Sequence, residues 1–236
     1  MLKIFRNFMG HLDKGCKNML NSHIMATHQI REDLKRFQEY KEKTPYVPMD
    51  LKQAANGAIY HGGDILVDEQ GRHRPHGKTF INAGYTLSGS ESKQLSNLAR
   101  YDFPFRGVLV KSIEAVLQSL KFQHPYTQRL VWDYYGLEAN HVKANADHNW
   151  KEDGILHIQG EPIKRDSSEY DRLVEEIYIS AYQNPLYRNI LLRIPADKRI
   201  VHSIGKQHKT QTVLTRLEFE TNLNSLKGFT KQEMSK

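Results

Sequence analysis

The sequence predicts an α+β fold that is mainly helical and arranged around a small β-sheet. Two segments, residues 111–122 and 170–183, carry apolar residues at helical spacing, so each presents one stripe for burial. Short runs rich in β-branched residues, such as 65–67 and 79–81, lie near glycines and turn residues and are typical of strands. Because the helical segments are the longer ones, we expect the strands to be few and short.

An N-terminal extension over residues 1–75 is predicted to be helical and then hairpin-like. Residues 27–43 are strongly charged with a narrow apolar stripe, and Pro45 disfavours helix for the residue before it. A short capped helix over 51–56, closed by Gly57, is expected next. We expect this part of the extension to pack on the main domain.

Residues 76–226 are predicted to form a single main domain. Its expected helices are 111–122, 126–137, 170–183, 186–193 and 211–226, and its expected strands are 79–81, 108–110 and 200–202. Asp166 followed three residues later by Glu169 has the form of a capping box before the third of these helices. The polar residues 227–236 are expected to be a disordered tail.

The charge balance mildly favours a polyanionic partner. The chain has 34 Lys+Arg against 27 Asp+Glu, a net charge of +7, which suits nucleic acid or phosphate-bearing nucleotides. The GxxxxGK[ST] phosphate loop, the GxGxxG fingerprint and zinc-finger spacings are all missing from the sequence. Their absence argues against a P-loop NTPase, a Rossmann dehydrogenase and a zinc-finger protein.

Several features predict a cytoplasmic protein with no membrane partner. No apolar run approaches the roughly 18 residues that a membrane helix needs, and the N-terminus lacks a signal-peptide pattern. The single cysteine, Cys16, excludes an internal disulfide and suits a reducing compartment. Nothing in the sequence predicts the oligomeric state.

Histidines and acids gather between residues 61 and 76 and raise the question of a metal. His61, His73 and His76 lie there with Asp64 and Asp68. Their spacing matches no standard zinc pattern, and no cysteine accompanies them. We therefore expect no metal site and no cofactor.

An acid, an amide and an amine share one side of the helix predicted at 111–122. Glu114, Gln118 and Lys121 are spaced i, i+4, i+7 and fall within about 60° of one another, beside the apolar stripe. Such a row at the edge of a core can form a reaction site. On spacing alone, the alternative is an ordinary solvated helix flank in which Lys121 pairs with Glu114.

Several phrases follow one another along residues 79–226. They are LSNL at 95–98, the aromatic stretch 101–105, the pattern Ser112, Glu114, Gln118, Lys121 and Phe122, the run 182–185 followed by 190–192, and 209–219 with an acid at Glu218. The order of these phrases resembles the NADAR family, which includes a bacterial riboflavin-pathway N-glycosidase. The resemblance implies a single NADAR-like catalytic domain.

The chain departs from the family's pattern before the last helix. Thr210 stands where the family usually has Asn, and Val213 where it has Gly. A characteristic D-x-x-W-G phrase is replaced by residues 202–206. These departures are those of a divergent member, of the kind that a virus or plasmid carries, in which substrate choice can differ.

The resemblance implies hydrolysis of the bond between ribose C1′ and a nitrogen. We expect removal of ADP-ribose from guanine in nucleic acid, a reversal of ADP-ribosylation that would serve counter-defence. Charge develops on the ribose, so a carboxylate is needed to stabilise it or to activate water, and the leaving base needs a proton. Glu114 is the expected carboxylate. Lys121 is expected to donate a proton, hold phosphate or attack an opened ribose as a Schiff-base amine.

Substrate-binding residues are expected around this pair. Asn97 and Gln118 would orient ribose hydroxyls or the carboxylate through amide hydrogen bonds. Arg100, Tyr101, Lys206 and Lys209 would anchor the pyrophosphate and stack on the base. Glu218 is expected to brace the final helix, opposite a lysine.

Two other hypotheses stay open. One is an N-glycosidase acting on ribosyl-aminopyrimidine intermediates of the riboflavin pathway, with a nucleotide-like small molecule as its partner. The other, of a different class, is an inactive module that binds ADP-ribose or nucleic acid, favoured by the missing D-x-x-W-G phrase.

Overall fold

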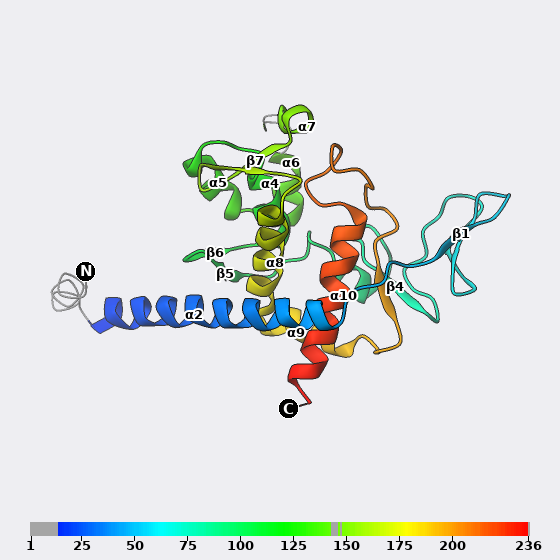
Figure 1. Cartoon of the computed structure of the whole chain (residues 1–236), viewed down its shortest axis with the longest axis horizontal. Helices are drawn as coiled ribbons and strands as arrows, with labels where there is room; N and C mark the ends of the chain where they lie inside the picture. Colours follow the sequence, from blue (N-terminus) through cyan, green and yellow to red (C-terminus); the bar gives the residue numbers. More distant parts are fainter. Residues whose placement is uncertain (1–13, 143–145, 147, 236) are drawn as a thin grey trace.

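A computed structural model describes residues 14–142, 146 and 148–235, with side chains described from Met25 onward. The part of the predicted extension before residue 14, the Cys16 side chain and the last residue of the predicted tail lie outside this description. In Figure 1, helix α2 runs across the molecule, α8 and α10 cross it, and the strands around β1 project to one side.

The predicted α+β class, mainly helical, is confirmed. The described helices are α2 (Lys14–Lys43), α3 (Ser90–Gln94), α4 (Ile113–Ser119), α5 (Pro125–Trp132), α6 (Gly136–Val142), α7 (Trp150–Asp153), α8 (Ser168–Tyr182), α9 (Pro185–Arg193) and α10 (Arg216–Glu233). The strands are β1 (Leu51–Gln53), β2 (Ile59–His61), β3 (Asp64–Val67), β4 (Phe80–Asn82), β5 (Phe103–Phe105), β6 (Val108–Val110), β7 (Ile155–Ile158), β8 (Glu161–Lys164) and β9 (Arg199–Val201).

The described strands form four small sheets where the sequence predicted one. β1, β2 and β3 pair antiparallel in that order, and β5–β6 and β7–β8 are antiparallel pairs. β4 and β9 pair in parallel, with Ile81 opposite Ile200, and so join segments more than one hundred residues apart. This last pair brings the segment after β9 beside the segment after β4.

Helix α8 lies at the centre of the core. It contacts α2, α4, α9, α10, β5 and β8, and buries Leu173, Ile177 and Tyr178 among others. Its start is capped by Ser167, whose hydroxyl accepts from the Tyr170 N–H at 3.1 Å. The predicted box between Asp166 and Glu169 does not form, because the serine takes the N-cap position.

The N-terminal helix packs on the main domain, as expected. The Phe37 ring of α2 meets Phe229 of α10 edge to face at 5.7 Å between centroids. Lys41 Nζ also forms an ion pair with Glu175 of α8 at 2.6 Å. Because Phe229 is buried in this contact, α10 continues to Glu233, and the prediction that residues 227–236 are disordered is wrong for residues 227–233.

Two further local predictions are wrong. Residues 51–53 form β1 instead of a short helix, because Gly57 adopts φ 87° and turns the chain so that β1 pairs with β2. The helix predicted at 126–137 divides into α5 and α6, with Asp133 at the C-cap of the first.

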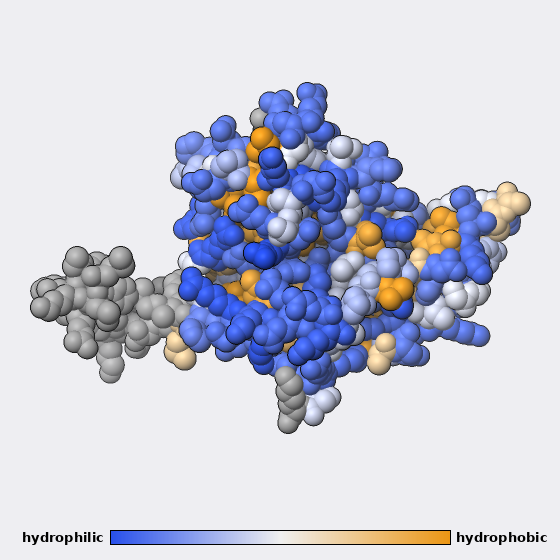
Figure 2. Space-filling view, viewed as in Figure 1, coloured by the Kyte–Doolittle hydropathy of each residue, from blue (hydrophilic) through white to orange (hydrophobic). Residues whose placement is uncertain are grey.

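The face in Figure 2 is largely hydrophilic, with small apolar patches that are clearest towards the β1–β3 end. None of the described helices combines the length and apolar character needed to cross a membrane.

Gly136 fixes the distance between α6 and the segment that precedes β5. A Cβ atom on this residue would lie 2.2 Å from the carbonyl oxygen of Leu98 and 2.3 Å from its Cα. Both are backbone atoms, which cannot rotate away. Only glycine therefore allows α6 to lie this close to residue 98.

We expect Gly136→Ala to lower the free energy of unfolding by about 3 kcal/mol, because an inserted methyl group forces backbone apart. Urea unfolding followed by circular dichroism measures the loss. Leu137→Ala is the matched control on the same helix, with a half-exposed side chain and an expected loss of about 1 kcal/mol. Equal losses in the two variants would contradict the close approach.

Candidate functional site

A cavity of about 350 Å³ opens beside α4. Its walls are α4, residues 96–98, α6 and the segment between β9 and α10. The polar side chains that line it include Asn97, Glu114, Gln118, Lys121, Asn140, His202 and Lys206. We call it the α4 cavity.

Glu114 is a buried carboxylate on the first turn of α4. Ser112 caps the helix by accepting from the Ala115 N–H at 3.1 Å. Glu114 is only 8% exposed, and its Oε1 accepts from Gln118 Nε2 at 2.7 Å and Asn140 Nδ2 at 2.9 Å. No described residue donates to its second oxygen, Oε2. That oxygen is therefore the one left for a ligand or water.

Gln118 connects Glu114 to Lys121. Its Nε2 donates to the glutamate, and its Oε1 accepts from Lys121 Nζ at 2.5 Å. The lysine ammonium also lies over the Trp150 ring, 5.6 Å from its centroid. Glu114 and Gln118 are buried and Lys121 is half-buried, so the interpretation of a solvated helix flank is wrong.

Asn97 is held by a hydrogen bond from the central helix. Its Oδ1 accepts from the Tyr178 hydroxyl at 3.0 Å, and its backbone carbonyl accepts from the Glu114 N–H at 3.0 Å. Burial is the main cause that raises the pKa of Tyr178, so the phenol stays protonated and keeps donating. These bonds leave the Asn97 amide nitrogen, which donates to no described residue, at the cavity wall.

His202 also lines the α4 cavity. Its Nδ1 lies 2.7 Å from the Ala83 carbonyl, which can only accept, so Nδ1 carries the proton. The ring stacks on Phe219 at 4.4 Å, and burial lowers its pKa. In the neutral ring Nε2 is then the acceptor. A histidine directly after a buried strand is the only sequence signal that could have found it.

The predicted site residues divide between different places. Asn97, Glu114, Gln118, Lys121 and Lys206 line the α4 cavity. Arg100 and Tyr101 line a neighbouring cavity, which shares Tyr85 with the α4 cavity.

Lys209 lies outside both of these cavities. It forms an ion pair with Asp166 and lines a depression beside Glu218. The geometry therefore gives no support to its predicted role in binding pyrophosphate, because its ammonium is already paired with the Asp166 carboxylate.

Glu218 braces the start of α10, as predicted, but its partner is an arginine. Arg165, 3% exposed, donates from both terminal nitrogens to the Glu218 carboxylate at 2.8 and 2.6 Å. The Thr215 hydroxyl and N–H bond the same carboxylate, completing a capping box. This fixes the end of the segment that forms one wall of the α4 cavity.

The histidine-rich stretch is occupied by structural contacts. His73 Nδ1 lies 2.7 Å from Ser203 Oγ, Asp68 pairs with Arg72, and Asp64 accepts from the Thr79 N–H at 2.7 Å. Among the described side chains, no three of His, Cys, Asp and Glu lie together in a way that could hold a metal ion.

Comparison with known proteins covers the part of the chain that builds these cavities. Residues 89–228 match the family model described as bacteriophage protein GP30.3. The chain is 32% identical over 136 residues to a protein of Enterobacteria phage T4 described as an uncharacterized 17.1 kDa protein in the Gp30–rIII intergenic region. That match covers 56% of this chain and 88% of the phage T4 protein. No solved structure matches the chain.

We expect the Glu218 carboxylate to make stability depend on pH below about 4.3. Burial alone would raise its pKa, but hydrogen bonds from Arg165 and Thr215 outweigh burial and lower it. A carboxyl with a lowered folded pKa stabilises the fold above its unfolded pKa of about 4.3, and loses that contribution as pH falls further. Glu218→Gln should cost about 2 kcal/mol at pH 7 and less at pH 3.

Glu220→Gln is the control, because burial raises the pKa of Glu220. Relative to this variant, wild type should become less stable as pH rises from about 4 towards 7. This pH dependence is opposite to the one expected for Glu218. Urea unfolding across pH 3 to 7 measures both differences. A Glu218→Gln deficit that does not shrink on acidification would contradict the lowered pKa.

Proposed function

The chain belongs to the bacteriophage protein GP30.3 family, and we propose that its α4 cavity hydrolyses the bond between ribose C1′ and a nitrogen. The substrate proposed is ADP-ribose linked to guanine in nucleic acid. One observation carries the proposal: a buried carboxylate, Glu114, is oriented by two amides and shares a cavity wall with Lys121. The resemblance of the same residues to the NADAR pattern supports it.

The reaction needs a carboxylate beside the ribose carbon. As the C1′–N bond breaks, its electron pair leaves with the base, and positive charge spreads over C1′ and the ring oxygen. Glu114 suits this task, because Gln118 and Asn140 hold one oxygen while Oε2 is left for the charge or for the attacking water. Water supplies the oxygen that ends on C1′, and one of its protons leaves through the carboxylate.

The departing base needs a proton or a hydrogen bond. Lys121 lies on the same wall, and Gln118 orients its ammonium. An ammonium is a donor, so Lys121 suits protonation of the leaving nitrogen or binding of a phosphate. The Asn97 amide and the His202 Nε2 face the same substrate with one donor and one acceptor.

The two alternatives rest on separate observations. The α4 cavity, at about 350 Å³, falls in the size range of small-molecule sites, which suits a ribosyl-aminopyrimidine phosphate as the substrate. The departures at Thr210 and Val213 suit an inactive module that binds ADP-ribose or nucleic acid, since Val213 lines the cavity.

We expect Glu114→Gln and Lys121→Met each to slow release of ADP-ribose from a guanine-ADP-ribosylated oligonucleotide at least 100-fold, because each removes a charged group from the reaction. Chromatography of released ADP-ribose measures the rate. Glu138→Gln, an exposed acid on α6, is the control and should keep wild-type activity.

Each other outcome has a definite meaning. Release that survives in both Glu114→Ala and Lys121→Ala would exclude this site. Binding of the oligonucleotide by wild type without any release would favour the inactive module. Cleavage of ribosyl-aminopyrimidine phosphate alone would favour the metabolite N-glycosidase.

A further inference from the structure

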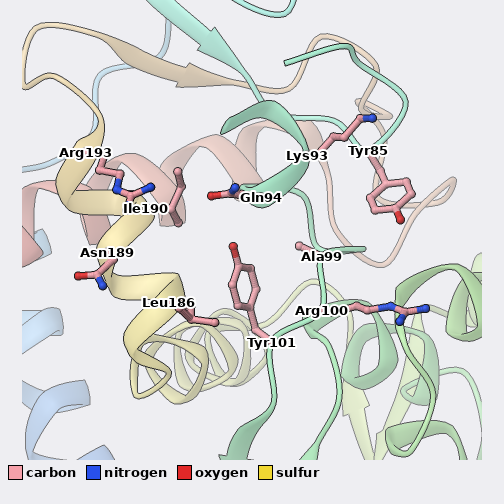
Figure 3. Close-up of a pocket in the computed structure, with 10 residues that line it drawn as sticks. All are labelled: Tyr85, Lys93, Gln94, Ala99, Arg100, Tyr101, Leu186, Asn189, Ile190 and Arg193. Atoms are coloured by element: carbon pink, nitrogen blue, oxygen red, sulfur yellow. The ribbon is translucent and has the colours of Figure 1, made fainter. Parts of the chain in front are cut away.

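A second cavity, of about 520 Å³, lies between α3 and α9. We call it the Tyr101 cavity. In Figure 3, α9 contributes Asn189, Ile190 and Arg193 to one side, while Lys93 and Tyr85 lie on the other and Tyr101 stands between them. Neither the proposed reaction nor the Glu114 row uses this space.

Tyr101 offers an unused hydroxyl at the centre of this cavity. The residue is only 7% exposed, and its ring packs edge to face on Tyr187 at 5.2 Å. Its hydroxyl bonds to no described residue and points towards Gln94 (Figure 3). Burial raises the pKa of the Tyr101 hydroxyl to about 12, so it remains a hydrogen-bond donor at neutral pH.

The charged side chains that line the Tyr101 cavity are all cations. They are Lys93, Arg100 and Arg193, and no carboxylate is among the lining residues. Neither Lys93 nor Arg193 forms an ion pair within the described part of the chain, and Arg193 lies close enough to Glu91 to help lower the pKa of that carboxyl. Arg100 lies over the Tyr135 ring, 4.7 Å from its centroid, and so leaves the cavity centre to the other two. A site with this charge selects an anion.

The two cavities adjoin along one short segment. Residues 96–98 line the α4 cavity and residues 99–101 line the Tyr101 cavity, while Tyr85 lines both. A chain-like ligand held in the α4 cavity can therefore continue past Tyr85 into the Tyr101 cavity. Tyr85 is half-buried, and its ring can stack against a base.

We propose that the Tyr101 cavity binds a neighbouring nucleotide of a single-stranded nucleic acid whose modified base occupies the α4 cavity. Lys93 and Arg193 bind its phosphates, the Tyr101 hydroxyl and Asn189 donate hydrogen bonds, and Tyr85 stacks on a base. This inference rests on the proposed function, which places the modified base in the α4 cavity. Binding of an unmodified strand can nevertheless be tested separately.

The observations favour a nucleic acid strand over other anions. A free metabolite of the size that the α4 cavity holds would leave the Tyr101 cavity empty. An acidic peptide would use the cations but not a stacking ring beside them. A single strand carries a phosphate and a base at every step, which matches a cavity that offers both cations and the Tyr85 ring. A paired strand would hide the base that must enter the α4 cavity.

Binding of a fluorescein-labelled 12-nucleotide single strand, unmodified, to the full chain tests the proposal. The double variant Lys93→Ala, Arg193→Ala should weaken binding about tenfold, and the slope of log Kd against log salt should fall by roughly 1.4, about 0.7 per phosphate contact. Tyr101→Phe should weaken binding less and leave the salt slope unchanged. Arg31→Ala, Lys35→Ala on α2 removes the same charge and should change neither quantity.

Separate measurements distinguish the outcomes. Wild-type affinity in the Lys93, Arg193 variant, or an equal loss in the α2 control, would overturn the proposal. If the Lys93, Arg193 variant bound free ADP-ribose equally more weakly, the cavity would be part of the metabolite site and the proposal would be overturned. Tighter binding of a matched duplex than of the single strand would also overturn it. Failure of wild type to release ADP-ribose would overturn the proposed reaction alone, because the strand in this assay carries no modification.

Discussion

The burial of α4 on every side is the constraint on which the rest of the site depends. All seven of its residues, Ile113–Ser119, are buried, so Glu114 and Gln118 lie inside the protein as well as the apolar stripe. A buried carboxylate must be hydrogen-bonded or it destabilises the fold by several kcal/mol. Gln118 and Asn140 satisfy one Glu114 oxygen, and the backbone of Asn97 accepts from its N–H. The hydrogen bonds that allow this carboxylate to be buried therefore also fix its orientation in the α4 cavity.

The sequence predicted those parts of the fold that local pattern alone determines. The α4 row follows from residue spacing, and α8 and α9 are separated where Asn184 and Pro185 require a break. Other features depend on partners distant in the chain. β1 forms because β2 pairs with it, α6 begins where Gly136 meets Leu98, and the end of α10 is ordered because Phe37 packs on Phe229. Spacing within one segment carries no information about such contacts.

The candidate site was predictable to the same extent. Helical periodicity put Glu114, Gln118 and Lys121 together correctly. Residues 96–101 are neither helix nor strand, so no periodicity tells which way each side chain points, and Asn97 faces one cavity while Tyr101 faces the other. Arg165 was missed as the partner of Glu218 because the two lie 53 residues apart and approach only through packing.

The wall formed by residues 203–214 has a different character from α4. It contains no helix or strand, and it is bounded by β9 on one side and by the Thr215 capping box, clamped to Arg165, on the other. Residues 206–211 of this wall are exposed, so substitutions there disturb few packed contacts and cost little in folding, whereas Val213 belongs to the core. The two walls of the α4 cavity therefore differ in how much a substitution costs: the exposed positions of this segment tolerate change, and the buried positions of α4 do not.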